Sequence, residues 1–247
     1  MLAGWRPPLW GVAATVAGVA AFVSLGLWQL DRADEKRAML ALDDSAAAAP
    51  ALQSLDATQA LGPELRFRRA RLQGRYEGSH QVLLQSMTSG GRDGFQVLTP
   101  LRLENGALLM VNRGWVAADA PGSTAEDLAV DDAARSVYGR LNVLPRPGLR
   151  LGDNAPAGPH DADWPRLYLY PTAEELSIAF GEPVADVQLQ LDANAPAGFE
   201  RDWPTVNAGP ERHVGYALQW FTFALVLIVI FVLLTRPRSP GSQDNAA

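Results

Sequence analysis

Hydrophobic residues are concentrated in two long runs, one near each end of the chain. Residues 9–30 and residues 214–234 contain no Asp, Glu, Lys or Arg. At a rise of about 1.5 Å per helical residue, each run covers about 30 Å, which matches the hydrocarbon thickness of a bilayer. We therefore expect a membrane protein with two transmembrane helices, residues 9–30 and 212–234, on either side of a domain of residues 31–211.

The first run has a second interpretation, as a cleaved signal peptide. The segment SAAAAP, residues 45–50, has the small residues of a cleavage site. However, the apolar run is too long for the hydrophobic region of a signal peptide, and the charged stretch DRADEKR separates it from the small residues. The sequence favours an uncleaved anchor.

Short segments of strand character fill most of the region between the two runs. Gly, Asn and Pro separate seven strand candidates, at residues 69–77, 80–86, 94–104, 107–117, 136–144, 166–170 and 186–192. Asn105-Gly106, between the third and the fourth, predicts a hairpin with a type I′ turn, which needs positive φ angles at both positions. We expect a mostly β domain, with strands forming a partly closed barrel.

One short helix interrupts these strands. Thr172 and Glu175 have the spacing of a capping box, and Gly181 is a typical stop. Its predicted apolar side consists of Leu176, Ile178 and Phe180. With this helix the domain has an α+β fold, preceded by an Ala-rich linker at residues 43–62, and order is expected to resume near Arg66.

The charges around the two runs predict an orientation. Two spans leave the tails, residues 1–8 and 235–247, on one side of the membrane, and their arginines favour the cytoplasm: Arg6, Arg236 and Arg238. Three basic residues at the inner end of the first run argue for the opposite orientation: Arg32, Lys36 and Arg37. A large domain translocates largely regardless of such charges. In a bacterium the protein would be a multi-pass protein of the inner (cell) membrane with a periplasmic domain.

Composition excludes several kinds of site. The chain has no cysteine, so it has no disulfide, thiolate metal site or cysteine nucleophile. Its net charge is −6, with no clustered basic stretch or nucleic-acid motif, so we expect no nucleic-acid partner.

Catalytic motifs are also missing from the sequence. It contains no G-x-S-x-G, H-E-x-x-H or phosphate-loop pattern. Ser79 and His80 are adjacent, but a triad requires a base and nucleophile that meet in space with a third group orienting the base. His160, Asp161 and Asp163 could ligate a metal, although they lie in a Pro- and Gly-rich stretch typical of a solvated loop. We expect a protein that is not an enzyme.

Polar and aromatic residues gather where the two spans meet the domain. The end of the first span and the start of the second lie at the same leaflet, which brings together Trp28, Gln29, Arg32, Arg212, His213, Tyr216, Gln219 and Trp220. An aromatic belt explains the Trp and Tyr residues, and snorkelling explains Arg212. A histidine gains little from the interface, whereas a neutral imidazole can ligate haem iron, so His213 is a candidate haem-iron ligand.

Arg113, Gly114 and Trp115 form a second notable cluster, at the end of a predicted strand. They could be structural, with Arg113 paired to a carboxylate and Trp115 in the core. They could equally form an interaction surface. The sequence does not choose between these alternatives.

Three ordered motifs resemble those of the Surfeit locus protein family, the Surf-one or Shy-one membrane factors that assist assembly of cytochrome c oxidase. They are LGLWQLDRADEK at 25–36, GFQVLTPLRLENGALLMVNRGWV at 94–116 and RHVGYALQWF at 212–221. The resemblance extends over nearly the whole chain. It implies a role in maturation of the oxidase's catalytic subunit, in which the protein transiently holds haem a and assists its insertion, with the catalytic subunit and haem a synthase as partners alongside the lipid bilayer.

The resemblance also assigns residues. The family's H-x-x-Y-A-x-x-W motif falls on His213, Tyr216 and Trp220, its G-x-W-Q-x-x-R on Gly26, Trp28, Gln29 and Arg32, and its R-G-W on Arg113, Gly114 and Trp115. Arg212 stands where many relatives are expected to have Asn, so the role of that position stays open. Arg212 and Arg32 could pair with haem propionates, because guanidinium groups bind carboxylates in a planar fork. The alternative is a scaffold that grips an oxidase intermediate without haem, with Gln29 and Gln219 bonding across helices. A third class, a membrane-anchored hydrolase, would need catalytic residues that the sequence does not bring together.

Overall fold

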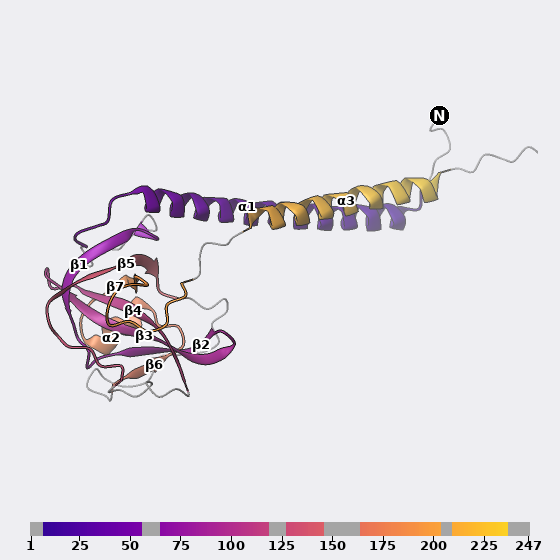
Figure 1. Ribbon diagram of the computed structural model, residues 1–247. Coiled ribbons are helices and arrows are strands. Elements are labelled where there is room, and N and C mark those ends of the chain that lie inside the picture. Colours follow the sequence, from indigo (N-terminus) through magenta and orange to yellow (C-terminus); the bar gives the residue numbers. More distant parts are fainter. Residues whose placement is uncertain (1–6, 56–64, 119–126, 146–163, 204–208, 237–247) are drawn as a thin grey trace, which may run out of the picture. The chain divides into compact units, whose positions relative to one another are not determined.

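The fold is described from a computed structural model, which places residues 7–55, 65–118, 127–145, 164–203 and 209–236. The chain divides into two compact units, each described by itself (Figure 1). One is a helix pair from residues 1–40 and 207–247, and the other is a β domain of residues 41–206. The candidate metal ligands His160, Asp161 and Asp163 lie outside the described residues.

The described residues of the β domain form seven strands, all of them at the predicted segments. They are β1 (Arg69–Tyr76), β2 (Val82–Ser89), β3 (Arg92–Leu103), β4 (Leu108–Ala117), β5 (Arg135–Val143), β6 (Arg166–Tyr168) and β7 (Val184–Leu191). Their order in the sheet is β1-β5-β7-β4-β3-β2-β6, and β1 also pairs with β3. That extra pairing closes β1, β5, β7, β4 and β3 into a barrel, which confirms the α+β fold with a partly closed barrel.

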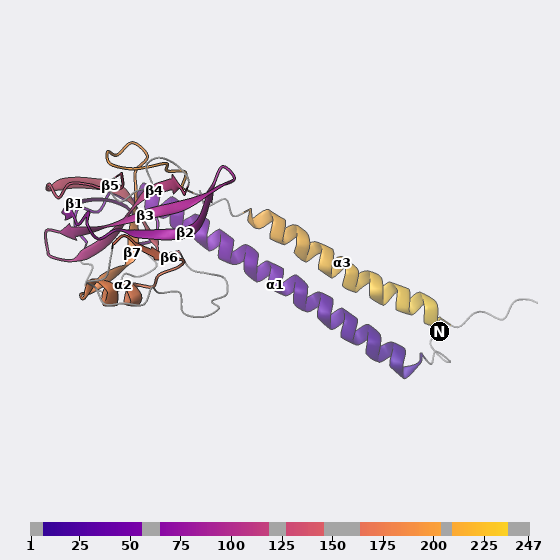
Figure 2. The same ribbon diagram turned by 90° about the horizontal axis from the view of Figure 1, so that it is seen from below.

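The length of β3 explains how the sheet both closes and continues (Figure 2). β4 pairs along one edge of this 12-residue strand. On the other edge, the first part of β3 pairs with β2, and its last three residues pair with Gly74–Tyr76 of β1. β2 and β6 therefore extend beyond the barrel as a short sheet.

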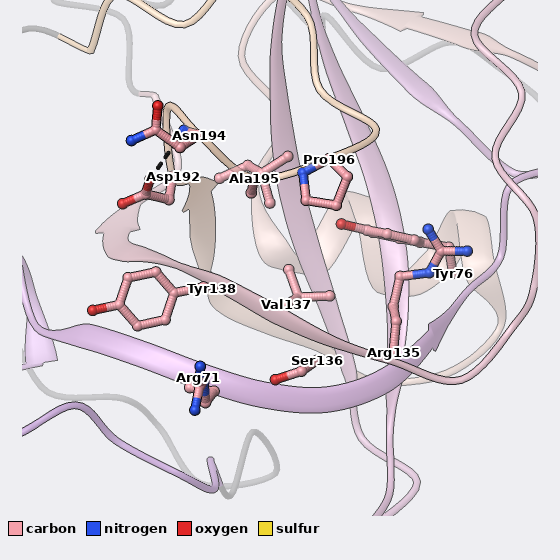
Figure 3. A pocket seen from close by; sticks show the side chains of 11 residues that line it. Arg71, Tyr76, Arg135, Ser136, Val137, Tyr138, Asp192, Asn194, Ala195 and Pro196 are labelled. Atoms are coloured by element: carbon pink, nitrogen blue, oxygen red, sulfur yellow. Dashed lines mark hydrogen bonds between the residues drawn. The ribbon is translucent and has the colours of Figure 1, made fainter.

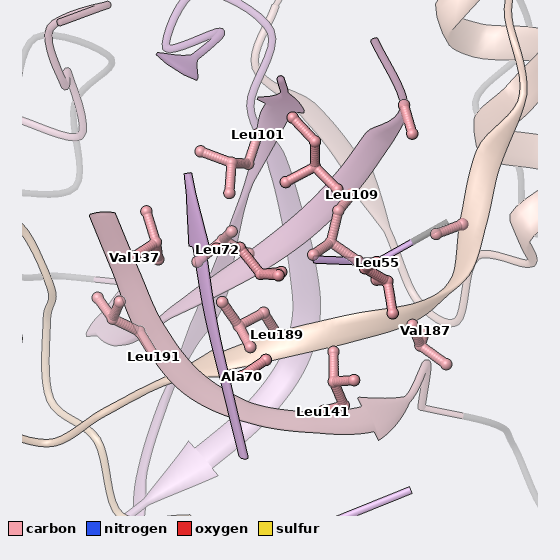
Figure 4. Close-up of a cluster of buried hydrophobic side chains, with 14 of the residues drawn as sticks. Leu55, Ala70, Leu72, Leu101, Leu109, Val137, Leu141, Val187, Leu189 and Leu191 are labelled. Carbon is pink, nitrogen blue, oxygen red and sulfur yellow. The ribbon is translucent and has the colours of Figure 1, made fainter. Parts of the chain in front are cut away.

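The barrel interior is filled by aliphatic side chains from every strand of the ring (Figure 4). Successive side chains of a strand point to opposite faces, and β1 follows this rule strictly, with alternate residues exposed and buried. Leu72, Leu109, Leu141 and Leu189 are each at most 1% exposed. This alternation in the sequence is why the strands could be predicted.

A second apolar cluster lies on the outer face of the sheet. Leu108 and Met110 of β4 point into it, whereas their neighbours Leu109 and Val111 point into the barrel. Helix α2 (Ala173–Phe180) covers this cluster. Strand β4 is thus buried on both faces, which explains the continuous apolar run of residues 108–111 at its start.

Helix α2 has the predicted caps but not the full predicted apolar side. The Thr172 hydroxyl accepts from the Glu175 N–H, the Glu175 carboxylate accepts from the Thr172 N–H, and Gly181 adopts the left-handed conformation. Leu176 is fully buried, but Ile178 is 68% exposed. Ile178 lies half a turn from Leu176, so the two side chains cannot share one face.

The hairpin at residues 103–107 is present, but its turn is not type I′. The Gly106 N–H donates to the Leu103 carbonyl, and the Leu103 N–H donates to the Ala107 carbonyl. Only Gly106 has a positive φ, and Asn105 does not. The loop therefore has three residues and ends in a left-handed glycine, the second common form of hairpin connection. Asn105 instead donates its side-chain amide to the Leu55 carbonyl, 3.0 Å away.

The predicted linker at residues 43–62 is more ordered than expected. Residues 43–48 belong to helix α1 (Leu9–Ala48), which continues well past the apolar run, and Asp43 pairs with Arg140 at 2.5 Å. Residues beyond the helix already pack on the barrel: Leu52 pairs with Ala70, and Leu55 joins the core. Order thus resumes before Arg66, because hydrogen bonding to β1 and burial of Leu55 offset the weak local pattern. Residues 56–62 lie outside the described part.

The second unit consists of the first 32 residues of α1 together with α3 (Pro210–Thr235). Both helices are long and apolar enough to cross a bilayer. The chain is a membrane protein in which two such helices flank the barrel domain in sequence.

The first prediction concerns the barrel core. Leu189→Ala should lower the free energy of unfolding by about 2–5 kcal/mol, because it leaves a cavity in a closed interior that cannot collapse freely. Ile178→Ala, at an exposed position, should change it by less than about 0.5 kcal/mol. Denaturant unfolding of the purified protein compares the two. Equal effects would contradict the assignment of Leu189 to the core and Ile178 to the surface.

The second prediction concerns acid stability. Arg102 lies between Glu182, 2.5 Å away, and Glu77, 2.6 Å away. The Arg102 hydrogen bond holds the pKa of Glu182 below its ordinary value, against a smaller opposing effect of burial. The stability from this pair is therefore complete above the unfolded pKa of about 4.3 and is lost as the pH falls through the folded pKa.

Glu182→Gln should accordingly lose less stability than the parent between about pH 5 and pH 3. Glu104→Gln, at an exposed turn, is the matched control and should follow the parent. Thermal unfolding midpoints across this pH range provide the measurement. A parallel fall in the parent and Glu182→Gln would show that the ion pair does not contribute to acid stability.

Candidate functional site

A seam of small residues brings α1 and α3 together. A Cβ built on Gly18 would lie 2.7 Å from Leu227 Cδ2, and one on Gly26 would overlap the Phe221 ring. Gly11 faces Phe231, so positions that rise along α1 meet positions that fall along α3 and the helices are antiparallel. Small residues at such a seam let helix backbones approach closely, as is common in membrane helix pairs. The seam continues through the buried residues Ala33, Ala217 and Ala224.

The close approach places two of the predicted site residues in direct contact. His213 Nδ1 lies 2.8 Å from Gln29 Oε1. A carboxamide oxygen can only accept a hydrogen bond, so Nδ1 must carry the proton. In the neutral imidazole, Nε2 is then the unprotonated nitrogen with a free lone pair. The bond therefore fixes both the tautomer and the orientation of the ring.

Trp220 belongs to an aromatic cluster beside this pair. Its ring stacks on Phe22 with centroids 5.9 Å apart, and Phe223 meets both rings edge-on at 5.8 Å. Phe22 and Phe223 were not among the predicted site residues. A heptad pattern counted from Gly11 and Gly18 in the first apolar run would have placed Phe22 at the seam.

The remaining predicted residues surround this centre without a common contact among the described residues. Trp28 and Tyr216 are 50% and 48% exposed. The Arg32 guanidinium lies 5.8 Å from the Trp28 ring centroid and pairs with Glu35 at 2.7 Å. Arg212 and Gln219 are exposed, so no described contact joins Gln219 to the other helix. The structure thus places Gln29 in contact with His213, whereas the side chains of Trp28, Tyr216 and Arg212 are exposed.

Arg113, Gly114 and Trp115 belong to the barrel domain, where Arg113 and Trp115 are buried at 2% and 7% exposure. They do not form an exposed interaction surface. Segment 197–200 pairs with this end of β4: the Trp115 N–H donates to the Glu200 carbonyl at 2.7 Å, and the Phe199 N–H donates to the Arg113 carbonyl at 2.7 Å. Gly114 has φ +117°, and a Cβ there would lie 2.6 Å from the Glu200 carbonyl oxygen. The motif fastens the last part of the domain to the barrel.

Arg113 lacks the carboxylate partner that the structural interpretation expected. Among the described residues it donates only to neutral acceptors: Gln81 Oε1, Thr99 Oγ1 and the carbonyls of Leu128 and Ala197. Its guanidinium also lies 4.8 Å from the Phe199 ring centroid. Burial lowers the pKa of Arg113 from its ordinary value.

No described contact completes a catalytic or multi-residue metal site. Ser79 Oγ lies 3.0 Å from His80 Nδ1, but the other described neighbours of the His80 ring are Trp164 and Phe180. No carboxylate orients the histidine within the described part of the chain. The same residues contain no group of three or more His, Cys, Asp or Glu side chains that could hold a metal ion.

Comparisons with known proteins give the family. The family model described as the SURF1 family matches residues 16–225. The chain belongs to the SURF1 family. The match includes Gln29, His213 and all seven strands, so both the helix pair and the barrel are parts of the family unit.

Relatives of full length support the assignment. A SURF1-like protein of Rickettsia felis is 26% identical over 228 residues, which cover 87% of this chain and 92% of the relative. A SURF1-like protein of Rickettsia bellii is 23% identical over 90% of both chains. A SURF1-like protein of Monosiga brevicollis is 26% identical over 86% of this chain and 82% of its own.

The seam provides the third prediction. Gly26→Val should push the helices apart, because its branched side chain overlaps the Phe221 ring. The chain has no cysteine, so Gln29→Cys with His213→Cys creates a unique pair for a short bis-maleimide. The cross-linking yield should fall several-fold when Gly26→Val is added.

Gly215→Val is the matched control, because no atom lies within 4 Å of a Cβ built on Gly215. It adds the same side chain to α3 away from the seam and should leave the yield unchanged. If Gly26→Val and Gly215→Val gave the same yield, the packing of α1 against α3 through the glycines would be wrong.

Proposed function

We propose that this chain is a membrane assembly factor for cytochrome c oxidase that holds haem a and assists its insertion into the catalytic subunit. The SURF1 family is known in general as a family of cytochrome oxidase assembly factors. The observation that carries the haem proposal is the bond between His213 and Gln29, which leaves Nε2 as the nitrogen able to ligate iron.

The residues at the helix pair fit a haem group. Haem iron needs only one or two axial ligands, so a single imidazole suffices where a multi-ligand metal site is absent from the described residues. Iron-ligating histidines characteristically donate their second ring N–H to an acceptor, which is the role of Gln29 here. The bound group would supply a Lewis-acidic iron and a large apolar ring.

Other side chains of the helix pair would complete the site. Half-exposed Trp28 and Tyr216 offer apolar faces, and Trp220 is held by Phe22. Arg212 is exposed and can bind a propionate, whereas Arg32 would have to exchange its pairing with Glu35. A single ligand in an open site gives modest affinity, which suits a protein that passes its cargo on.

The charges of the two tails support a proposal for the location of the protein in the cell. We propose an inner-membrane protein with both termini in the cytoplasm and the barrel domain in the periplasm, following the arginines of the tails. Its partners would be the oxidase catalytic subunit, haem a synthase and the bilayer. Such a protein needs no catalytic residues of its own.

A second function has its own support. The hydrogen bond between Gln29 and His213 is by itself a sufficient structural use of both side chains, since it satisfies polar groups across a helix pair. In this alternative the protein is a scaffold that stabilises an oxidase assembly intermediate and binds no haem.

The fourth prediction separates the two functions. Protein purified in detergent from cells that make haem a should carry its absorption spectrum, and His213→Ala should abolish it by removing the axial ligand. Gln29→Ala should weaken haem affinity by about 10–100-fold, as loss of an outer-shell partner commonly does. His80→Ala is the matched control and should keep the parent spectrum and stoichiometry.

Oxidase activity in a deletion strain adds a second readout. Under the haem proposal the His213→Ala variant fails to restore activity, whereas a Ser79→Ala, His80→Ala double variant restores it fully. A parent protein without haem that still restores activity would favour the scaffold. Loss of activity in the double variant would favour a hydrolase.

A further inference from the structure

A cavity of about 290 Å³ lies at one end of the barrel, outside the helix pair (Figure 3). Its walls come from β1, β5 and the segment of residues 192–196 that follows β7. The volume is enough for several water molecules, and therefore for a small polar molecule. None of the residues that line it belongs to the proposed haem site.

The hydroxyl of Tyr76 is the unusual group in this cavity. The residue is 2% exposed and its ring belongs to the barrel core. Its hydroxyl points into the space between Val137 and Pro196 and has no hydrogen-bond partner among the described residues (Figure 3). Among the described residues the Tyr76 oxygen is not one of the fully buried polar atoms without a partner, so it reaches the cavity and can bond there to solvent or to a ligand. Burial raises the pKa of Tyr76 to about 12, which keeps the hydroxyl a proton donor at neutral pH.

Two arginines, Arg71 and Arg135, line the cavity together with Tyr76. The Arg135 guanidinium lies 5.5 Å from the Tyr76 ring centroid, and Arg71 lines the opposite wall, 6.0 Å from the Tyr138 ring centroid. Arg113 and Arg201 lie behind the cavity, and both lower the pKa of Tyr76 through their charge, although burial outweighs them.

Several arginines act on the cavity or on Tyr76. Among the described residues Arg113 donates only to neutral groups, and Arg201 donates to the backbone carbonyls of Asp192, Ala195 and Phe199. Among the described residues, the carboxylate that lines the cavity is Asp192, which accepts from the Asn194 N–H, and Asp131 pairs with the lining residue Arg135. Arg71 and Arg135 thus line the cavity, the charges of Arg113, Arg135 and Arg201 act on Tyr76, and the low dielectric of the barrel wall strengthens their combined field.

We propose that this cavity binds the oxyanion of a small soluble molecule, through a phosphate or carboxylate group. The Tyr76 hydroxyl would donate a hydrogen bond to it, and Arg135 and Arg71 would supply charge and further donors. Such charge-assisted bonds are shorter and stronger than neutral ones. Binding here would stabilise the barrel domain independently of the helix pair, because a ligand that binds only the folded state shifts unfolding by mass action.

The fifth prediction tests this site with inorganic phosphate and acetate as probes. Full-length protein in detergent is unfolded thermally at rising concentrations of each probe, with chloride at equal ionic strength to account for screening. At least one probe should raise the midpoint more than chloride does. Tyr76→Phe keeps the ring and removes only the hydroxyl, so it should weaken that probe's affinity about tenfold or more.

A charge-matched pair of variants keeps the test decisive if Tyr76→Phe fails to fold. Arg135→Gln removes a cavity arginine and should also weaken binding, whereas Arg69→Gln, exposed on the same barrel and away from the cavity, should bind like the parent. Neither probe exceeding chloride would overturn the proposal. So would equal loss in Arg135→Gln and Arg69→Gln, because the response would then be general surface screening.

Discussion

The hydrogen bond between His213 Nδ1 and Gln29 Oε1 is the interaction on which the proposed site depends. It joins residues 184 positions apart and can form only because the glycine seam lets α1 and α3 approach closely. In an apolar environment each of these groups needs a partner, and the pair satisfies one polar atom on each side chain. The bond also determines which imidazole nitrogen remains available. This one hydrogen bond therefore depends on close helix packing, gives two polar side chains a partner, and determines which nitrogen of His213 can bind a ligand.

The barrel domain is organised around a different constraint, the closure of its sheet. β3 is long enough to pair with β1 at one end while β2 occupies the rest of the same edge. Segment 197–200 then pairs with the end of β4. Glycine is required at position 114, because the backbone of this segment lies too close to leave room for a Cβ atom. This pairing buries Arg113 beside the cavity that contains the Tyr76 hydroxyl. The closure that stabilises the domain therefore also places the Arg113 guanidinium near Tyr76, 6.0 Å from its ring centroid.

Much of the fold could be predicted because local sequence patterns indicate its strands and its short helix. Short runs of strand character between Gly, Asn and Pro located all seven described strands, and a capping box with a terminal glycine located α2. Features set by tertiary contacts could not be predicted in this way. Asn105 does not take the conformation of a type I′ turn, and its side-chain amide donates a hydrogen bond to the Leu55 carbonyl. Residues 51–55 are ordered by backbone hydrogen bonds between Leu52 and β1, which their own sequence pattern does not indicate.

The candidate site was predictable to the same extent. Placing both spans antiparallel brought Gln29 and His213 to one level, and the structure joins them. The partners of Trp220 and the burial of Arg113 depend on which face of an element packs, which one sequence does not specify for a helix that is apolar all round. The unpartnered hydroxyl of Tyr76 gave no signal in the sequence, because β1 reads there as an ordinary alternating strand.

The central claim is that His213 is the iron ligand and not merely a structural partner of Gln29. Chemical rescue tests it directly: His213→Gly is prepared from cells that make haem a, and imidazole is added while the haem spectrum is recorded. The account predicts that haem binding is lost in the variant and returns with imidazole, because the free ring restores the axial ligand without restoring the side chain. A variant that retains the parent haem spectrum without imidazole would contradict it.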